Sequence, residues 1–178
     1  MEHEITRWVD PEEHTRLDNG KTYEATPEEM NALLARLGLL SLSRFVFFIK
    51  IVHGQAKGTY ILTGTLEADL EQACVASLKP VSDHVQDSFE VILAPEGYDI
   101  PDDEDEDWDE DIEIITPKGV DVGEIAAQYL SMSLNPFPRA EGGAVADLGA
   151  KNVDVMTEDE AATARNPFHV LKNMKENG

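Results

Sequence analysis

The chain has 178 residues, 36 of them acidic and 14 basic, so its formal net charge at pH 7 is -22. Such a surface repels phosphate backbones and anionic lipid, because both are bound mainly through cationic side chains. It either attracts basic proteins or simply keeps the protein soluble. The one cysteine excludes an internal disulfide and a zinc site built from several thiolates.

The N-terminus has neither the basic nor the apolar region of a secretion signal, and no run reaches the roughly 18 apolar residues of a membrane span. We therefore expect a cytoplasmic protein without a membrane partner. Residues 4–9 alternate as in a short strand, and residues 11–20 contain the proline, asparagine and glycine of an irregular connection.

A capped helix is predicted next. Thr26 is a capping residue, Pro27 occupies the first helical position, and Glu29 follows three residues after the cap. Apolar side chains then recur at helical spacing until Gly38, which ends the helix.

The middle of the chain predicts a long β-hairpin. Residues 44–53 are rich in Phe, Val and Ile, which is typical of a central strand. Residues 54–58 turn the chain back into an amphipathic strand that should pair antiparallel with the first. Gly64 inside this second strand suggests a bulge or a bend that helps the sheet curl, and the break at Lys79 and Pro80 is expected to stop its pairing.

The following segments predict one more strand, a loop and a second helix. The further strand covers residues 85–93. The window 99–113 holds eleven acidic residues and no basic one, which predicts a solvated loop. Ile112, Ile114 and Ile115 then form a short strand. Asp121 caps a second helix that ends near Leu134.

Together these elements predict an α+β fold: a curved, mainly antiparallel β-sheet with two main packing helices, a long acidic loop and a flexible C-terminal tail. We assign residues 1–138 to the α+β domain, with its acidic loop at 99–111. Residues 139–165 are expected to be a flexible linker and 166–178 a short helical segment. That segment is too short to be a stable helix alone, so its apolar face needs a partner in its own domain or in another molecule. We expect a monomer.

The sequence shows none of the common catalytic or metal-binding motifs. No glycine-rich phosphate loop or GxSxG turn is present, and the five histidines lack metal-ligand spacing. As a calcium loop, the acidic run would place Asp107 where a glycine is required. Cys74 is expected to be buried at a strand end. We therefore expect no enzyme, cofactor or metal; a hydrolase with paired carboxylates would need a deep pocket holding an acid of raised pKa.

Two segments contain aromatic residues whose role is open. Trp108 either pins the acidic loop to the domain or anchors a partner. Residues 136–139 are read first as a helix stop with a buried ring, and otherwise as a recognition surface. The partner-binding hypothesis covers eleven residues: Asp102, Asp103, Glu104, Asp105, Glu106, Asp107, Trp108, Phe137, Arg139, Phe168 and Leu171.

Several ordered motifs resemble a known family. A Gly-x-Leu-x-Ala-x-x-x-Gln-x-Cys run is matched by Gly64, Leu66, Ala68, Gln72 and Cys74, followed by Pro80. A Pro-Phe-Pro-Arg segment lies at 136–139, and an Asn-Pro-Phe-x-x-Leu segment at 166–171. In these features the chain resembles the YceD-like bacterial proteins, described as large ribosomal RNA subunit accumulation proteins, in their alphaproteobacterial form.

The resemblance implies a cytoplasmic factor without known enzymatic activity that supports normal levels of large-subunit ribosomal RNA. Many members have a Cys-x-x-Cys where this chain has Ser77, so a two-thiolate site is excluded here. The acidic composition suggests that the partner is a basic ribosomal protein or assembly factor. The alternative is direct RNA binding by cations near the C-terminus, namely Arg139, Lys151, Arg165, Lys172 and Lys175.

Overall fold

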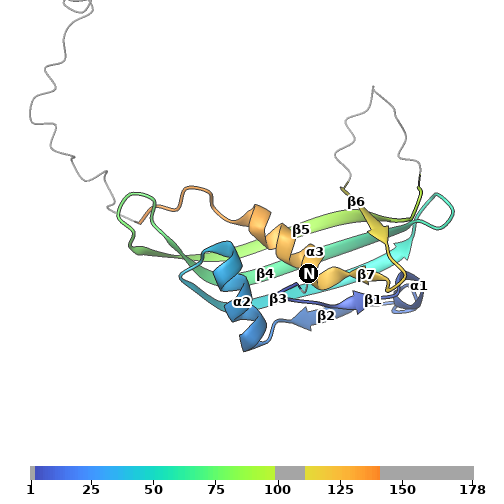
Figure 1. The fold of residues 1–178 in the computed structure, drawn as a ribbon, viewed down its shortest axis with the longest axis horizontal. Helices are drawn as coiled ribbons and strands as arrows, with labels where there is room; N and C mark the ends of the chain where they lie inside the picture. The colour runs from blue at the N-terminus through green and yellow to red at the C-terminus, as the bar shows by residue number, and fades with distance from the viewer. Residues whose placement is uncertain (1–2, 99–110, 141–178) are drawn as a thin grey trace, which may run out of the picture. The chain divides into compact units, whose positions relative to one another are not determined.

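The computed structural model describes residues 3–98 and 111–140 (Figure 1). The chain divides into two units, Met1–Gly143 and Ala144–Gly178, and all described residues lie in the first. The elements in chain order are β1 (Trp8–Val9), α1 (Pro11–His14), β2 (Lys21–Glu24), α2 (Pro27–Leu37), β3 (Ser41–His53), β4 (Tyr60–Ala73), β5 (Pro80–Pro95), β6 (Asp111–Ile115), β7 (Val120–Asp121) and α3 (Val122–Ser133).

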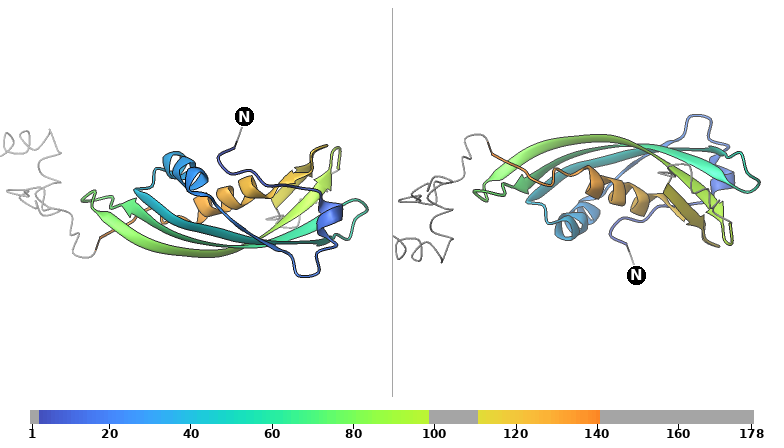
Figure 2. Two further views of the ribbon diagram at one scale, coloured as in Figure 1. Left: turned by 90° about the horizontal axis from the view of Figure 1, so that it is seen from below. Right: turned by 90° about the horizontal axis from the view of Figure 1, so that it is seen from above.

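Five strands form one open sheet in the order β2-β3-β4-β5-β6. All neighbours pair antiparallel except β5 and β6, which are parallel. Figure 2 shows the sheet curving around α2 and α3, which lie on its concave side. The predicted α+β fold, with a curved and mainly antiparallel sheet, is confirmed.

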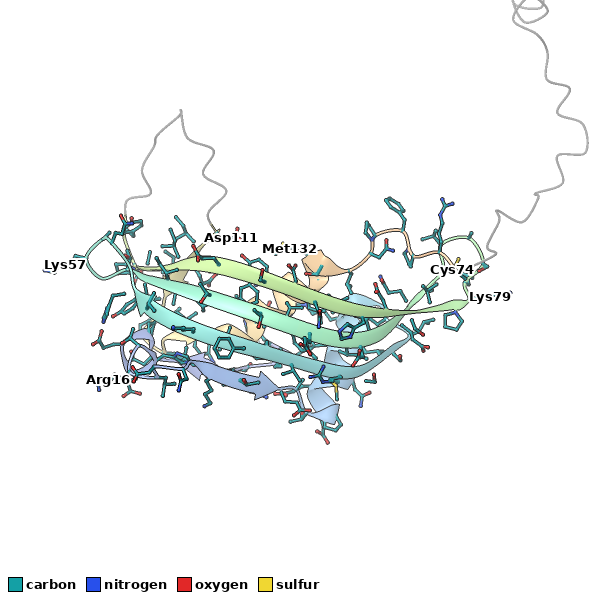
Figure 3. All side chains as sticks on the ribbon, turned by 180° about the vertical axis from the view of Figure 1, so that it is seen from behind. Arg16, Lys57, Cys74, Lys79, Asp111 and Met132 are labelled. Carbon is teal, nitrogen blue, oxygen red and sulfur yellow. The ribbon has the colours of Figure 1, made fainter. Side chains whose placement is uncertain are left out.

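The alternation of side chains decides which face of the sheet is covered. On β4, Leu62, Leu66 and Leu70 are 0 to 3% exposed on the concave side, whereas Thr63 and Thr65 are exposed on the other. Figure 3 shows this second face from behind, and no helix of the described residues lies over it. The core therefore lies between the concave face and the helices, where Leu33 of α2 and Leu130 of α3 have no exposed surface.

Both main helices begin and end where the sequence predicts. Thr26 and Glu29 form a reciprocal capping box: Glu29 N donates to Thr26 Oγ1 at 3.3 Å, and Thr26 N donates to Glu29 Oε2 at 2.8 Å. Gly38 ends α2 in the left-handed conformation, with φ 66°. Asp121 caps α3, and Leu134 follows its last turn.

A small second sheet joins the N-terminus to the start of α3. Trp8 pairs with Asp121 and Val9 with Val120. Gly119 has φ +98°, and a Cβ there would collide with the carbonyl of Val9, so only glycine fits. Figure 1 shows β1 and β7 on the side of the main sheet that carries the helices.

The bulge predicted at Gly64 is wrong. The pairing of β4 runs in continuous register past Gly64 on both sides, and the register shift lies between Leu42 and Arg44 of β3. A Cβ added at Gly64 would overlap the ring of Phe89 on the neighbouring strand. The glycine therefore makes room for an aromatic ring.

The break predicted at Pro80 is also wrong. Pro80 opens β5 and pairs with Ala73, so this strand is longer than the predicted range 85–93. A proline is tolerated at the first position of a strand, where its missing N–H is not needed by the ladder. The residues between Ala73 and Pro80 form a hairpin turn in which Leu78 has φ 58°.

The N-terminal third differs from the prediction in two places. Only Trp8–Val9 of the expected strand 4–9 are β-structure, and the connection 11–20 contains helix α1. Asp10 caps this short helix, accepting from Glu12 N at 2.9 Å. Asp10, Pro11 and Glu13 repeat the cap, proline and acid pattern of α2, which is the signal that would have identified α1.

Candidate functional site

The predicted partner-binding residues fall partly outside the described ranges. Residues Asp102 to Trp108, Phe168 and Leu171 lie outside them. Asp111, the last residue of the predicted loop, is the first residue of β6. Figure 3 places Asp111 at the same end of the sheet as Lys57, and Cys74 and Lys79 at the other end.

The two predicted contact regions are therefore attached at opposite ends of the sheet. β5 connects these ends with 16 residues, or roughly 50 Å at about 3.3 Å per residue. The structure does not bring Phe137 and Arg139 together with the attachment of the acidic loop. A partner that touched both regions would have to extend along the length of the domain.

At the loop end, an open groove of about 510 Å³ lies between β6 and α3. Its lining includes Asp111 and Glu113 from β6, and Gln128, Tyr129 and Met132 from α3. The groove thus contains carboxylates from β6 next to larger polar and apolar side chains from α3. Because Asp111 and Glu113 of β6 are the last acidic residues of the window 99–113, the groove carries the negative charge of that end of the window.

Tyr129 connects this groove to the sheet. Its hydroxyl donates to Asp111 Oδ2, and its ring stacks on Phe89 with a centroid distance of 4.3 Å and an interplanar angle of 10°. Burial, together with the Asp111 carboxylate, raises the pKa of Tyr129, so the ring stays a neutral donor. The sequence reading did not single out Tyr129, although an aromatic with a polar tip on a helix of small residues was a usable signal.

Ion pairs of Arg36, which also lines this groove, connect α2 to α3. Arg36 of α2 donates to both carboxylate oxygens of Glu124 of α3, each at 2.8 Å, and to Glu4 Oε2 at 2.9 Å. The hydrogen bonds from Arg36 lower the pKa of Glu124. In Glu113, desolvation and the nearby charge of Glu124 raise the pKa. Glu113 is nevertheless exposed, in an open groove, which is not the deep pocket that a carboxylate hydrolase would need.

A smaller cavity of about 270 Å³ lies next to the open groove, at the start of α3. Trp8, Asp121, Glu113 and Glu124 contribute to its lining, together with His3. Asp121 Oδ1 accepts from Arg7 N at 2.7 Å, Gly123 N at 3.2 Å and Glu124 N at 3.4 Å. The other oxygen, Asp121 Oδ2, is buried without a hydrogen-bond partner among residues 3–98 and 111–140.

At the opposite end of the sheet, the expectation of a buried Phe137 ring is wrong. Phe137 is 71% exposed, whereas the adjacent Pro138 is buried. The carbonyl of Pro138 accepts from Val75 N at 2.9 Å, and the carbonyl of Asn135 accepts from Gln72 Nε2 at 3.1 Å. These contacts fix the segment to the β4–β5 hairpin and leave Phe137 and Arg139 at the surface.

Further apolar side chains are exposed near Phe137. Val75 is 51% exposed and Leu78 is 77% exposed on the hairpin. The hairpin residues 72–82 and the segment 134–140, which are joined by these hydrogen bonds, contain no acidic residue. We call the surface formed by Val75, Leu78 and Phe137 the apolar tip; it contrasts with the acidic remainder of the chain.

Cys74 is fully buried at the strand end, as predicted. Its surroundings are more polar than expected, since Ser77 and main-chain groups of Ala140, Ala76 and Ser77 hydrogen-bond to it. These bonds lower the pKa of the thiol to about 6. Within the described ranges, no group of three His, Cys, Asp or Glu side chains has the arrangement of a metal site.

Three arginines are held by carboxylates. The Arg7–Glu29 pair has a distance of 2.6 Å, and Arg44 Nη1 lies 2.7 Å from Glu67 Oε2. Together with the Arg36–Glu124 pair, these contacts engage three of the ten Lys and Arg residues of the described part. The sequence composition could not show which arginines are paired in this way.

Comparison with known proteins adds a family. No curated protein and no solved structure matches the chain. No helix in the described part is long and apolar enough to cross a membrane. A family model described as "Large ribosomal RNA subunit accumulation protein YceD" matches residues 62–175, which is more than half of the sequence and includes the segment from β4 to α3. The chain therefore belongs to the YceD family of large ribosomal RNA subunit accumulation proteins.

Proposed function

We propose that this protein is a non-enzymatic, cytoplasmic and monomeric factor in the biogenesis of the large ribosomal subunit. In this proposal it binds a basic ribosomal protein or assembly factor and thereby supports accumulation of the ribosomal RNA. The family description supports the connection to large-subunit RNA. The charges of the chain support a basic protein as the direct partner.

The pairing of Arg7, Arg36 and Arg44 carries the choice of a protein over RNA. RNA binding requires cations that can contact phosphates, but each of these guanidinium groups already contacts a carboxylate of the same chain. At the same time, Asp111 and Glu113 extend the acidic window into a groove. A basic surface could occupy that groove and gain charge complementarity as well as faster association.

The apolar tip is the second contact in this proposal. Exposed apolar side chains that cluster on one surface are typical of a protein interface. Phe137 presents an aromatic ring on a segment that is fixed by main-chain hydrogen bonds, so little conformational entropy is lost when it is covered. Arg139 and Lys79 lie in the same segments and would meet acidic groups at the rim.

The test is affinity purification of the full chain from cells at moderate salt, followed by mass spectrometry and RNA sequencing. One variant replaces the nine acidic residues in the window 99–110 by Asn and Gln. Its matched control scrambles the same window and keeps the charge. We expect a basic large-subunit protein to co-purify with the wild type and the scrambled control, and to be lost from the neutral variant.

Two results would contradict the proposal. One is recovery of RNA without a basic protein, in equal amounts from the wild type and the neutral variant. The other is equal recovery of the basic protein by the neutral and scrambled variants, which would show that the acidic window is not a contact. Loss of RNA on replacing Arg139, Lys151, Arg165, Lys172 and Lys175 by Gln would favour direct RNA binding instead.

A further inference from the structure

We propose that the basic partner binds by adding an extended segment to the outer edge of β6, as a sixth strand of the main sheet. In this segment Lys or Arg residues alternate with apolar residues. The inference rests on the proposed function, because it names the place and the way in which the basic protein is recognised.

The main chain of β6 is the first argument. β6 is the last strand in the sheet order, and among the described residues its only neighbour in that sheet is β5. An edge strand presents a row of main-chain N–H and C=O groups on its outer side. Within residues 3–98 and 111–140, the main chain of Asp111–Ile115 makes no main-chain hydrogen bond beyond the β5 ladder. The outer row of β6 can therefore pair with another strand.

Open space follows β6 along its length. The groove of about 510 Å³ is lined by Asp111, Ile112 and Glu113 of β6. The smaller cavity of about 270 Å³ shares Glu113 with this groove and adds Ile114. Both hollows are bounded by α3 on their other side, through Ile125 and Gln128. An added strand would therefore find room for its side chains between β6 and α3.

The register of β6 decides which side chains the added strand would meet on the helix side. Asp111 is paired with Val91, and Glu113 is paired with Leu93. Val91 and Leu93 are buried under the helices, so both carboxylates lie on that same face of the sheet. Side chains that are neighbours across two strands interact directly. Cationic side chains of the added strand would therefore lie beside Asp111 and Glu113.

The other face of β6 is apolar. Ile112 is paired with Ile92, and Ile114 with Ala94, so the two isoleucines of β6 point away from the helices. Ile114 is 40% exposed, and Ile112 and Ile92 are half-buried. Apolar side chains of the added strand would cover this row. Because side chains alternate between the two faces of a strand, β6 selects a segment in which basic and apolar residues alternate.

The charges of β6 disfavour a second copy of this chain as the occupant. If β6 paired with β6 of another copy, the carboxylates of Asp111 and Glu113 would lie beside the same carboxylates of that copy. Like charges across two strands are destabilising, and charged side chains commonly protect an edge strand from self-pairing. The same charges attract a basic segment, so they select the partner as well as preventing self-association. Main-chain hydrogen bonds would then supply affinity, and the alternating side chains specificity.

The first test adds the octapeptide acetyl-(Lys-Val)4-amide to the full chain and follows the main-chain amides by NMR and hydrogen exchange. One control peptide, acetyl-(Lys-Lys-Val-Val)2-amide, has the same composition and charge without the alternation. A second control is the alternating peptide N-methylated at every residue, which keeps the charge but cannot pair as a strand. We expect the alternating peptide to bind at least fivefold more tightly than either control. It should also slow hydrogen exchange at alternate amides of β6 at least tenfold.

A pair of variants tests the contribution of the carboxylates. Glu113→Gln should weaken binding of the alternating peptide at least threefold, because it removes a charge beside the added strand. The matched control Glu28→Gln removes the same charge from an exposed position on α2 and should leave binding unchanged.

Three outcomes would overturn the inference. The first is equal affinity for the alternating and the N-methylated peptide, which would show attraction by charge alone. The second is binding without slower exchange in β6, and the third is equal weakening by Glu113→Gln and Glu28→Gln.

A competition experiment separates this inference from the proposed function. The basic protein recovered by affinity purification is bound to the full chain and challenged with a saturating amount of each peptide. We expect the alternating peptide to displace this protein and the N-methylated peptide to leave it bound. If the protein stays bound in the presence of the alternating peptide, the edge of β6 is not its recognition site, whereas the proposed function stands.

Discussion

The ring of Phe89 stacks on the ring of Tyr129, with centroids 4.3 Å apart and planes within 10° of each other. The other side of the Phe89 ring covers Gly64, and the Tyr129 hydroxyl donates to Asp111. One continuous set of contacts thus connects β4, β5, α3 and the first residue of β6. Gly64, a residue of the family pattern, is in this way linked to the attachment of the acidic window.

Gly64→Ala should destabilise the protein, because the new methyl group would overlap the Phe89 ring. Overpacking of a well-packed core typically costs about 1–3 kcal/mol. Urea unfolding followed by circular dichroism would measure the change. The double variant Gly64→Ala/Phe89→Leu should be less destabilised than the sum of the two single variants, because leucine leaves room for the methyl. Strictly additive effects would show that Phe89 is not the residue that requires glycine.

Tyr129→Phe should loosen the start of β6 while keeping the stacked ring. It removes the hydrogen bond to Asp111, which is worth about 0.5–1.5 kcal/mol, or more for a charged acceptor. Hydrogen exchange should become faster at Ile112 and Ile114, with little change in the centre of β4. Ser131→Ala, an exposed position on the same helix, should leave exchange unchanged. Equal exchange in Tyr129→Phe and wild type would show that the hydroxyl does not hold β6.

The fold was largely predictable because its signals are local. The capping pattern at Thr26 and the alternation along β4 depend on neighbouring residues, and both predictions are confirmed. The errors at Gly64 and Pro80 have a different origin. Gly64 is explained by Phe89, which lies 25 positions later, and Pro80 by its pairing with Ala73 across a turn. A glycine or proline reveals a constraint, but the sequence does not show what imposes it.

The candidate site was less predictable, because it depends on contacts between distant elements. The acidic window was evident from composition, but the groove beside it needs α3 to lie against β6. The small cavity at the start of α3 is lined by Trp8 and Asp121, residues more than 100 positions apart. For Phe137, an aromatic between two prolines suggested burial, whereas the structure buries Pro138 instead.

Arg36→Met should destabilise the protein and flatten its pH dependence in acid. Glu124, 8% exposed, would lose its bidentate partner. Breaking a buried pair costs about 3–5 kcal/mol; because the Arg36 side chain is 32% exposed, we expect about 1–3 kcal/mol. The pKa of Glu124 is lowered in the fold, so the pair stabilises above the ordinary glutamate pKa and this stability is lost as pH falls. Urea midpoints between pH 3 and 7 would measure both effects.

Arg44→Met is the matched control for Arg36→Met. Arg44 and Glu67 are each 43% exposed, and exposed pairs contribute little. We expect the urea midpoint of Arg44→Met, and the slope of this midpoint with pH, to equal those of wild type. If Arg44→Met destabilised the chain as much as Arg36→Met, the effect would reflect net charge, not the buried pair.

His14→Leu should stabilise the protein below pH 6.5. His14 is 4% exposed, and neither ring nitrogen has a hydrogen-bond partner in the part of the chain that the structure describes. Burial, with a smaller effect of Lys21, lowers the pKa of His14, so the native state resists protonation while the unfolded state accepts it. Wild type should therefore lose stability as pH falls from 7 to 5. His14→Leu should lose less, and His53→Gln, at an exposed position, should follow wild type; equal slopes for wild type and His14→Leu would contradict this account.

Cys74 should make stability rise with pH in the neutral to mildly alkaline range. Its pKa is lowered to about 6 by Ser77 and by main-chain groups, whereas an unfolded thiol titrates near 8.5. A lowered folded pKa means that the native state favours the thiolate. The stabilisation is therefore fully present above the unfolded pKa and is lost as pH falls through about 6. Cys74→Ser should remove this rise between pH 6 and 9, as measured by thermal melting across that range.

Ser77→Ala separates the hydrogen bond from the cysteine itself. Ser77 makes the largest contribution to the lowered pKa of Cys74, so its loss should move the thiol pKa upward. The pH range over which stability rises should therefore become narrower. Ultraviolet absorbance of the thiolate would follow the titration directly, with Cys74→Ser as the blank. Main-chain groups of Ala76 and Ala140 remain in this variant, so a partial shift is expected. An unchanged titration would mean that the main chain alone holds the thiolate, and that Ser77 serves only to shape the hairpin turn.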